Sequence, residues 1–312
     1  MAGNASFDAL ISTTLANYQK KLTDNVFNDR VLTWYLKEKG QVKLRGGTKI
    51  IEPLLYADNS TFGSYSGYDP IELTPQEGIT AAEYEWRQLA TSIAISGIEE
   101  AKNNGEQAVL DLLEAKVFQA EETMKEGLNT MLFADGSGNS SKDFNGLGNL
   151  VESGNTVGGI DSSALDNTWW RSYEENTGGA LTEAYMRTAY NSVSRGKDQP
   201  DIALTTQTLF EKFESLLTPQ VRYSDVKMAN LGFQNLMFKG APVVYDPACT
   251  SGTMYFLNSK YIKLVGHSDR WFTQTPFVRP ENMDARYSLI TAYGNLTVSN
   301  RKRLGKLTGK TA

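Results

Sequence analysis

The stretch Glu106–Asp135, EQAVLDLLEAKVFQAEETMKEGLNTMLFAD, is the most regular part of the chain. Its apolar residues recur at steps of three, four or seven, which places them along one face of a helix, with charged residues such as Glu121 and Lys125 off that face. The stripe consists of Leu110, Leu113, Val117, Met124, Leu128 and Met131. At 1.5 Å per residue the pattern predicts a rod of roughly 40 Å that stops near Gly136. A helix of this length usually braces something larger than a compact core.

The composition argues against several classes of function. The 312 residues, 40% of them hydrophobic, suffice for one large domain or two of ordinary size. A net charge of −5 argues against a protein that binds polyanions over its whole surface. The single cysteine, Cys249, excludes a disulfide within the chain, and with the single histidine, His267, it argues against a Cys/His metal site or a Ser–His triad. We interpret Cys249 as a small buried hydrophobe and His267 as an ordinary surface or packed residue.

The first fifteen residues show no secretory signal. They lack a basic region followed by a continuous apolar run, and no window of the chain reaches the roughly 18 apolar residues of a membrane span. We therefore expect a protein that is made and kept in a cytoplasm and has no membrane partner.

The N-terminal region predicts two helices. Residues 5–22 place one set of apolar side chains on a single helical face: Phe7, Leu10, Ile11, Leu15, Tyr18 and Leu22. A second, shorter helix is lined by Phe27, Val31, Trp34 and Tyr35 and ends at Gly40. These helices could fold on their own domain, but amphipathic segments this early in the chain favour a position across a neighbouring surface.

Between residues 41 and 96 the period changes to that of strands. Residues 49–55 are rich in β-forming side chains, residues 84–95 form a returning strand, and residues 58–80 between them are rich in Gly, Ser, Pro and aromatic residues. The pattern predicts a long two-stranded arm with a wide tip. Because an isolated hairpin is only marginally stable in water, the arm needs another surface, either its own core or the next subunit of an assembly.

The connector at residues 135–159 is rich in glycine, serine and asparagine. Oxygen-bearing residues alternate from Asp135 to Asp143 as in a calcium loop, but Ser140 stands where glycine is needed and Gly146 where glutamate is needed. A solvated connector is therefore favoured over a calcium site. Gly146 and Gly148 begin a dinucleotide-type G-x-G that lacks its third glycine.

The second half of the chain predicts mixed helices and strands. The expected elements are a helix at 182–193, a strand at 201–205, a helix at 209–217 and strands at 236–238 and 241–245, followed by a strand-rich end from Met254. The last twelve residues hold five bases and no acid, and these bases are Arg301, Lys302, Arg303, Lys306 and Lys310. Such a tail could contact nucleic acid, although a solvated or subunit-contacting end is favoured.

The order of these parts resembles the major capsid protein of tailed bacteriophages, which has the Hong Kong 97-like α+β fold. Three closing segments are also similar to that family: GAPVVYD at 240–246, MYFLNSKY at 254–261 and YSLITAYGNLTVSNR at 287–301. The resemblance implies a set of domains: an N-terminal arm (1–40), an extended loop (41–97), a peripheral domain with a spine helix (98–160), an axial domain (161–275), and a return to the peripheral domain with the basic tail (276–312).

The same resemblance implies a structural function rather than an enzyme. Copies of the chain would form the hexamers and pentamers of an icosahedral shell around double-stranded DNA, touched only weakly or locally, in a virion assembled in the host cytoplasm. Scaffolding, portal and decoration proteins are possible partners. Some relatives cross-link through a lysine on the extended loop, but no lysine occurs between Lys49 and Lys102, so a non-covalent shell is expected.

We predict assembly contacts and no catalytic, cofactor or metal residues. The predicted contact residues are Phe7, Leu10, Ile11, Phe62, Tyr65, Tyr68, Trp86, Arg301, Lys302 and Arg303. Two alternatives stay open: the shell of an encapsulin-type nanocompartment, which shares the fold, and a cytosolic enzyme that uses carboxylates. Glu99 and Glu100 are candidates for the enzyme, but adjacent residues would point apart on a strand or a helix.

Overall fold

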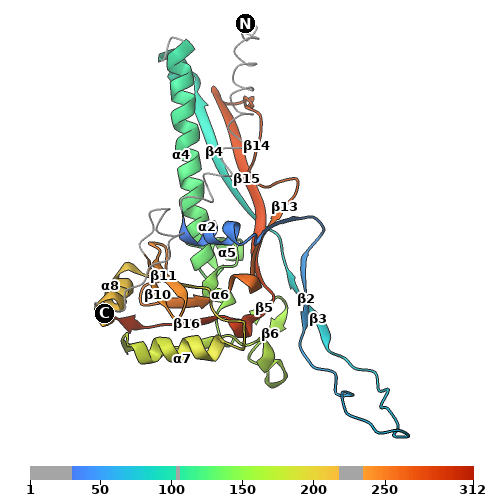
Figure 1. Cartoon of the computed structure of the whole chain (residues 1–312). Helices are drawn as coiled ribbons and strands as arrows, with labels where there is room; N and C mark the ends of the chain where they lie inside the picture. The colour runs from blue at the N-terminus through green and yellow to red at the C-terminus, as the bar shows by residue number, and fades with distance from the viewer. Residues whose placement is uncertain (1–29, 103–105, 218–234) are drawn as a thin grey trace.

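The computed structural model describes residues 30–102, 106–217 and 235–312. Figure 1 shows a long helix beside an elongated sheet, a lobe built on a second sheet at one end of that helix, and a hairpin that projects away from both. The helix predicted at 5–22, and with it Phe7, Leu10 and Ile11, lies outside the described residues.

The long helix α4 (Glu106–Phe133) follows the predicted stripe. Val117, Met124 and Leu128 are buried, and α4 packs along a strand of the elongated sheet. Glu121 and Lys125, which we expected to lie off the buried face, are buried as well, with exposed fractions of 1% and 8%. The Lys125 Nζ lies 3.6 Å from Glu121 Oε1 and also pairs with Glu122.

The reason for this additional burial lies at the C-terminal end of α4. Here the helix runs into the lobe, so a second face is covered in addition to the stripe (Figure 1). Asn129, which is buried, donates from Nδ2 to Oδ1 of the buried Asp246, 2.8 Å away. A single-stripe pattern cannot anticipate this second contact, since Asp246 lies 117 residues further along the chain.

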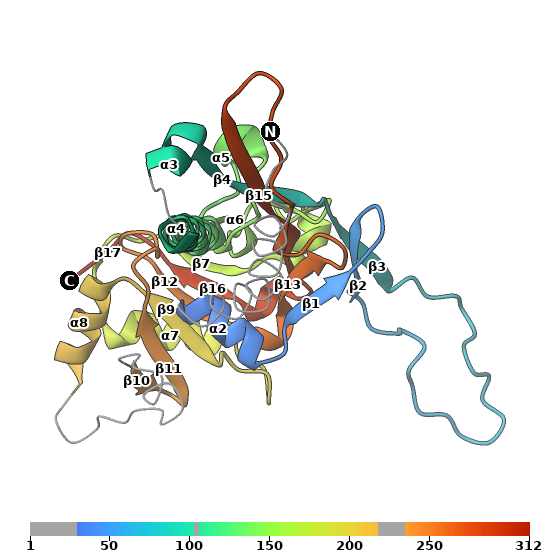
Figure 2. The ribbon, with the colours of Figure 1, turned by 90° about the horizontal axis from the view of Figure 1, so that it is seen from above.

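The elongated sheet has five strands. Its longest pairing is antiparallel and runs from Arg87↔Gly294 to Ser96↔Ala285. The sheet comprises β1 (Val42–Arg45), β13 (Ile262–His267), β15 (Ala285–Val298) and β14 (Thr273–Gln274) in that order, with β4 (Arg87–Ser96) on β15. In Figure 2, where α4 is seen nearly end-on, the helix lies beside β4 and β15.

The short helix α2 (Val31–Glu38) packs on its own subunit. Six consecutive residues, 31–36, are buried, and the Tyr35 hydroxyl donates to the carbonyl of Asp201 at 2.8 Å. The position across a neighbour that we favoured from the sequence is therefore wrong for this helix. It ends as predicted near Gly40, whose φ of +65° is one that glycine adopts readily.

The lobe is built on a six-stranded sheet with a core of its own. In sheet order its strands are β10 (Asn235–Phe238), β11 (Ala241–Tyr245), β9 (Ile202–Thr205), β12 (Met254–Leu257), β16 (Gly305–Leu307) and β7 (Tyr173–Glu175). Helix α7 (Glu183–Val193) packs on β16 and β7, and α8 (Gln207–Leu216) on β11. Met186, Phe213 and Phe256 are buried in this core. The elements predicted between 182 and 245 are thus present.

Two strands belong to a different sheet from the one that the predicted domain boundaries imply. Strand β13 falls in the predicted axial segment but pairs with β1 and β15 of the elongated sheet. Strand β16 falls in the predicted return segment but lies in the lobe, parallel to β7 and antiparallel to β12. The chain therefore crosses between the two sheets more often than limits at residues 160 and 275 allow.

Short elements connect these layers. They are α3 (Gly97–Lys102), α5 (Gly138–Ser141), α6 (Leu147–Leu150), β5 (Thr156–Val157), β6 (Ile160–Asp161), β8 (Gly179–Ala180), β17 (Lys310–Thr311) and the 3-10 turns η1 (Leu165–Trp170), η3 (Ser259–Tyr261) and η4 (Arg301–Arg303). Within α5, Asn139, Ser140 and Ser141 have φ values of 50°, 58° and 61°, so this connector is a left-handed turn rather than a regular helix.

Candidate assembly surfaces

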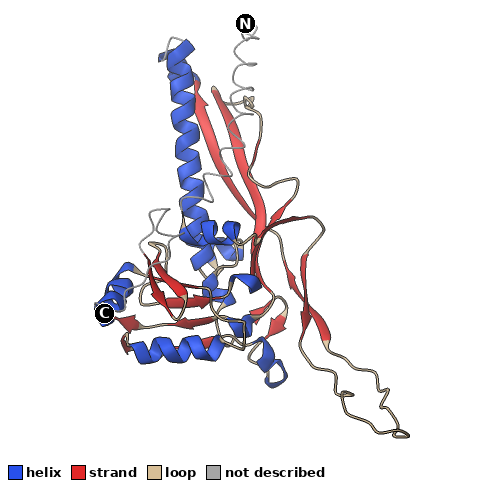
Figure 3. Ribbon diagram, viewed as in Figure 1, coloured by secondary structure: helices blue, strands red, loops and turns tan. Residues whose placement is uncertain are grey.

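The hairpin, residues 50–84, pairs β2 (Ile50–Leu55) with β3 (Ile79–Tyr84) in antiparallel register. One face of the pair is buried and the other is exposed, as the two-residue period of a strand requires. Figure 3 shows strands only near the root of the hairpin, and loop beyond them. A two-stranded arm with a wide tip is therefore present, but its returning strand is Ile79–Tyr84. Most of the returning strand predicted at 84–95 lies instead in β4, which pairs with β15 of the elongated sheet.

Polar anchors attach the root of the hairpin to the elongated sheet. The buried Tyr84 hydroxyl donates to the Val298 carbonyl at 2.9 Å and accepts from the Val298 N–H at 3.2 Å, and burial raises the pKa of this tyrosine. The Glu52 carboxylate, 1% exposed, lies 2.8 Å from Arg45 Nη1 and 2.6 Å from Lys263 Nζ. A buried carboxylate needs such pairing, so these contacts attach β2 to β1 and β13 of the elongated sheet.

A glycine permits the close approach of the root to the β5–β6 turn. The N–H of Glu83 donates to the Gly158 carbonyl at 3.0 Å, and Gly158 has a φ of +62°. A Cβ added at Gly158 would lie 2.6 Å from the Cβ of Ala82, closer than two such atoms can pack. A side chain here would push β3 out of position.

In the tip, residues 56–78, Tyr56 stacks on Trp169 with ring centroids 5.2 Å apart, but the large apolar side chains beyond it are exposed. The predicted contact residues Phe62, Tyr65 and Tyr68 are 95%, 66% and 106% exposed. The whole hairpin exposes nine large hydrophobic side chains: Ile51, Leu55, Tyr56, Phe62, Tyr65, Tyr68, Ile71, Leu73 and Ile79. Of these nine, our sequence reasoning named only Phe62, Tyr65 and Tyr68. An apolar surface of this extent on a projecting element is typical of a protein–protein interface.

Trp86, also a predicted assembly contact, acts within the subunit. Its indole Nε1 donates to the Gly47 carbonyl at 2.8 Å, and its ring meets the His267 ring edge-on with centroids 5.1 Å apart. Trp86 is half-buried and closes the corner where the hairpin leaves the sheet.

The basic segment, residues 301–310, is largely buried, so the solvated end, one of the two roles that we favoured, is wrong for most of it. Lys302 is exposed, but Arg301 and Arg303 are buried, with exposed fractions of 0% and 9%. The guanidinium of Arg301 donates from Nε to the Leu150 carbonyl at 2.9 Å, and from Nη2 to Asn155 Oδ1 at 2.5 Å and to the Glu152 carbonyl. Burial lowers its pKa to about 10, which leaves it protonated at neutral pH.

The remaining cations of this segment also find partners inside the subunit. Arg303 Nη1 donates to the Val193 carbonyl at 3.2 Å, and Lys306 Nζ lies 3.2 Å from Glu174 Oε1. Lys310 Nζ lies 3.6 Å from the centre of the Tyr185 ring. Carbonyl, carboxylate and ring partners take the place of water around these cations. This run of basic residues therefore packs within the lobe.

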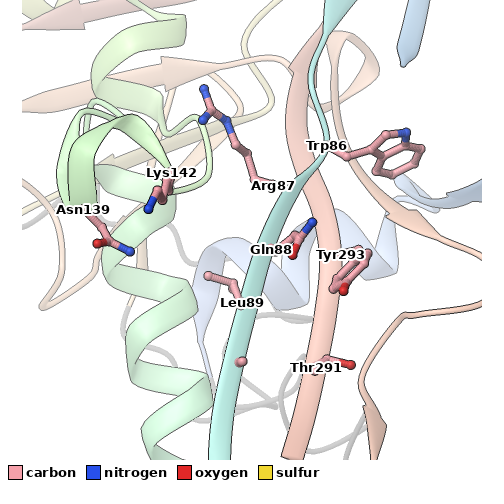
Figure 4. Close-up of a pocket in the computed structure, with 9 residues that line it drawn as sticks. Trp86, Arg87, Gln88, Leu89, Asn139, Lys142, Thr291 and Tyr293 are labelled. Carbon is pink, nitrogen blue, oxygen red and sulfur yellow. The ribbon is translucent and has the colours of Figure 1, made fainter. Parts of the chain in front are cut away.

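An open groove crosses β4 beside the root of the hairpin (Figure 4). It has a volume of about 480 Å³ and is lined by Trp86, Arg87, Gln88, Leu89, Ala90, Asn139, Lys142, Thr291 and Tyr293. Figure 4 shows Arg87 extending from β4 toward the α5 turn that carries Asn139 and Lys142, while Gln88 and Tyr293 lie on the other side of β4. Sequence reasoning missed this groove because its three parts are about 50 and 150 residues apart.

Side chains elsewhere that could take part in chemistry make structural contacts instead. Cys249 is buried, as predicted, and burial raises the pKa of its thiol. Glu99 accepts from the backbone N–H of Ser96, which, with Lys116, lowers the pKa of the carboxyl, so Glu99 is held as an anion. Within the ranges that the structure describes, no three His, Cys, Asp or Glu side chains gather as a metal site, and no helix has the length and apolarity to cross a membrane.

A spine helix against an elongated sheet, a separate α/β lobe and a projecting hairpin together define a shell-forming protein of the Hong Kong 97-like fold. Residues 89–311 match the family described as the SU10 major capsid protein. The chain belongs to that family and is a structural protein of a capsid shell. No curated protein matches the sequence.

Solved structures with the same fold cover nearly the whole chain. The capsid asymmetric unit of cyanophage A-1(L) is 18% identical with a TM-score of 0.70, over 88% of this chain and 91% of that one. The capsid of a native GTA particle is 10% identical with a TM-score of 0.59, over 88% and 90%. The SrpI encapsulin complex of Synechococcus elongatus PCC 7942 is 13% identical with a TM-score of 0.55, over 88% of each chain.

Proposed function

We propose that this chain forms hexamers and pentamers of a closed icosahedral shell around double-stranded DNA, in a virion assembled in the host cytoplasm. One observation carries the proposal: a projecting hairpin exposes nine large hydrophobic side chains. Burying one such side chain is favourable by about 1.5–3 kcal/mol, so repeated contacts between copies would supply the energy of assembly.

The contacts between copies are non-covalent in this proposal. The hairpin and the strand that follows it carry no lysine, since none occurs between Lys49 and Lys102. Packaged DNA would be touched weakly, because the net charge is −5 and much of the basic segment is buried. Scaffolding, portal and decoration proteins would be separate chains.

The test is assembly of the purified protein, followed by light scattering and negative-stain microscopy. Full-length protein should form hexamers, pentamers or closed particles, and deletion of residues 59–76 should leave the subunit folded but stop assembly. A matched control is Leu165→Ser, which removes an equally exposed apolar side chain (87%) outside the hairpin and should assemble normally. A monodisperse monomer under all conditions would refute the proposal.

An encapsulin-type shell is the second candidate, supported by the likeness of fold to the SrpI encapsulin. Both candidates predict closed particles, so the contents decide between them. Particles from infected or producing cells should protect double-stranded DNA from nuclease if the first proposal is correct. Particles that enclose a protein cargo and no DNA would favour the second.

A further inference from the structure

The groove beside the hairpin root is lined by cations without a carboxylate. Arg87 and Lys142 line it, and no Asp or Glu stands among its nine lining residues. Arg270 extends the positive charge at the rim, where its Cζ lies 5.5 Å from the centre of the Tyr293 ring. Asp143, although next to Lys142 in sequence, lies against Gly138 and is not part of the lining.

The two lining cations are incompletely paired. Arg87 donates from Nη1 to the Ser141 carbonyl, while its Nε is buried without a hydrogen-bond partner. Lys142 is exposed, and the structure shows no carboxylate paired with it in the described part of the chain. Among the described residues no carboxylate pairs with Arg87 either, so the groove keeps the positive charge of both cations.

The tip of the hairpin has the opposite charge. Residues 56–78 contain four acids, Asp58, Asp69, Glu72 and Glu77, and no base. The tip cannot reach the groove of its own copy, because the paired strands β2 and β3 carry it away from the body in both views (Figures 1 and 2). An acidic, apolar-rich tip and an open basic groove, with Trp86 and Tyr293 in its lining, are therefore complementary only between copies.

We propose that the groove of each copy receives the acidic tip of the next copy, with Arg87 and Lys142 pairing with its carboxylates. This inference rests on the proposed assembly and names the receiving site. Tip and groove are different surfaces, so the contact is head-to-tail, and such contacts form closed rings when their rotation closes. One tip fills one groove, and the same surfaces serve rings of five and of six copies.

Charge variants of Lys142 test the pairing, read as the critical concentration for assembly in light scattering. Arg87 is left intact because it also holds the α5 turn through Ser141. At low salt, Lys142→Glu should raise the critical concentration by about fivefold or more, the order expected for a lost ion pair replaced by repulsion. Lys142→Gln should have a smaller effect, and added salt should weaken wild-type assembly. The control Lys197→Gln removes an exposed lysine on the lobe and should change nothing.

A neutral tip and a charge swap make the test specific. In a background with Asp58→Asn, Asp69→Asn, Glu72→Gln and Glu77→Gln, Lys142→Glu should have little further effect. Combining Lys142→Glu with Glu72→Lys and Glu77→Lys should recover at least part of the lost assembly.

The outcomes separate this inference from the proposed function. If wild-type protein never assembles, the proposed function fails. If it assembles and Lys142→Glu behaves like Lys197→Gln, only the docking inference is overturned. Shells of Lys142→Glu that form normally but retain less DNA would assign the groove to phosphate and also overturn it.

Discussion

The tip of the hairpin exposes apolar side chains to solvent, whereas the basic segment buries charged ones. The tip exposes aromatic and aliphatic side chains, with Phe62 and Tyr68 almost fully in solvent, whereas the basic segment buries Arg301 completely. Water would normally be left to the charges and the interior to the apolar groups. The difference teaches that the subunit supplies partners for its buried charges but leaves the apolar side chains of the hairpin tip exposed. Such an exposed apolar tip is expected of a subunit that assembles into a shell.

The largest expected effect tests the buried side of this comparison. Arg301→Met should lower the free energy of unfolding by about 3 kcal/mol or more, because it leaves the carbonyls of Leu150 and Glu152 buried without a donor. Denaturant unfolding of unassembled subunits measures it. Lys302→Met, on the exposed neighbour, is the control and should stay within about 0.5 kcal/mol. Equal effects at the two positions would contradict the internal role of Arg301.

The next effect is at the root of the hairpin. Tyr84→Phe should cost about 2 kcal/mol, since the backbone N–H of Val298 loses an acceptor and its carbonyl loses a donor in a buried place. The same unfolding measurement reports it. Tyr65→Phe removes an equivalent hydroxyl from the exposed tip and should be neutral. A neutral Tyr84→Phe would show that the root is not held by this contact.

A smaller, pH-dependent effect on stability is expected at Glu174. Burial alone would raise the pKa of its carboxyl, but the N–H of Ser153 and the charge of Lys306 outweigh burial and hold it below its ordinary value of 4.5. The folded state thus binds this proton less readily than the unfolded state, so the contribution is present above about pH 4.5 and is lost as the pH falls through the folded pKa. Glu174→Gln should be less stable than wild type at neutral pH, and the gap should close in acid. A gap that persists at pH 2 would contradict this assignment.

The smallest effect on subunit stability should occur at the tip. Phe62→Ser with Tyr68→Ser should change the free energy of unfolding by less than about 0.5 kcal/mol, because both side chains are already in solvent. Assembly followed by light scattering should nevertheless be strongly impaired. A loss of stability comparable with that of Arg301→Met would mean that the tip packs on its own subunit, and the comparison would fail.

Much of the fold follows from short-range pattern. The stripe that includes Val117, Met124 and Leu128 predicted α4 because each side chain meets the same surface as the residue three or four positions away. The hairpin was predictable for a similar reason, since alternation and a Gly/Pro-rich interruption are local properties. The exposure of Phe62, Tyr65 and Tyr68 agrees with their prediction as contact residues, a role that stays a prediction until assembly is measured.

The candidate surfaces were less predictable, because they depend on partners distant in sequence. Nothing within ten residues of Arg301 shows that its guanidinium will meet carbonyls near residue 150. Nothing around Arg87 shows that the turn at Lys142 and the strand at Tyr293 will complete a groove. Charge runs look solvated in a sequence, since burial is decided by which elements close over them.

The sequence by itself determined the periodic elements and the acidic, lysine-free tip, because each depends on residue type and near spacing alone. Only the tertiary structure decided that Glu121, Lys125 and Arg301 lie inside, that β13 and β16 exchange sheets, and that the hairpin is left uncovered. The physical reason is that burying a side chain stabilises or destabilises the fold according to which groups replace the water around it. Around a buried charge, water is replaced by a carbonyl or a counter-charge from a distant part of the chain. Around the apolar side chains of the tip, we propose that it is replaced by another copy of the chain.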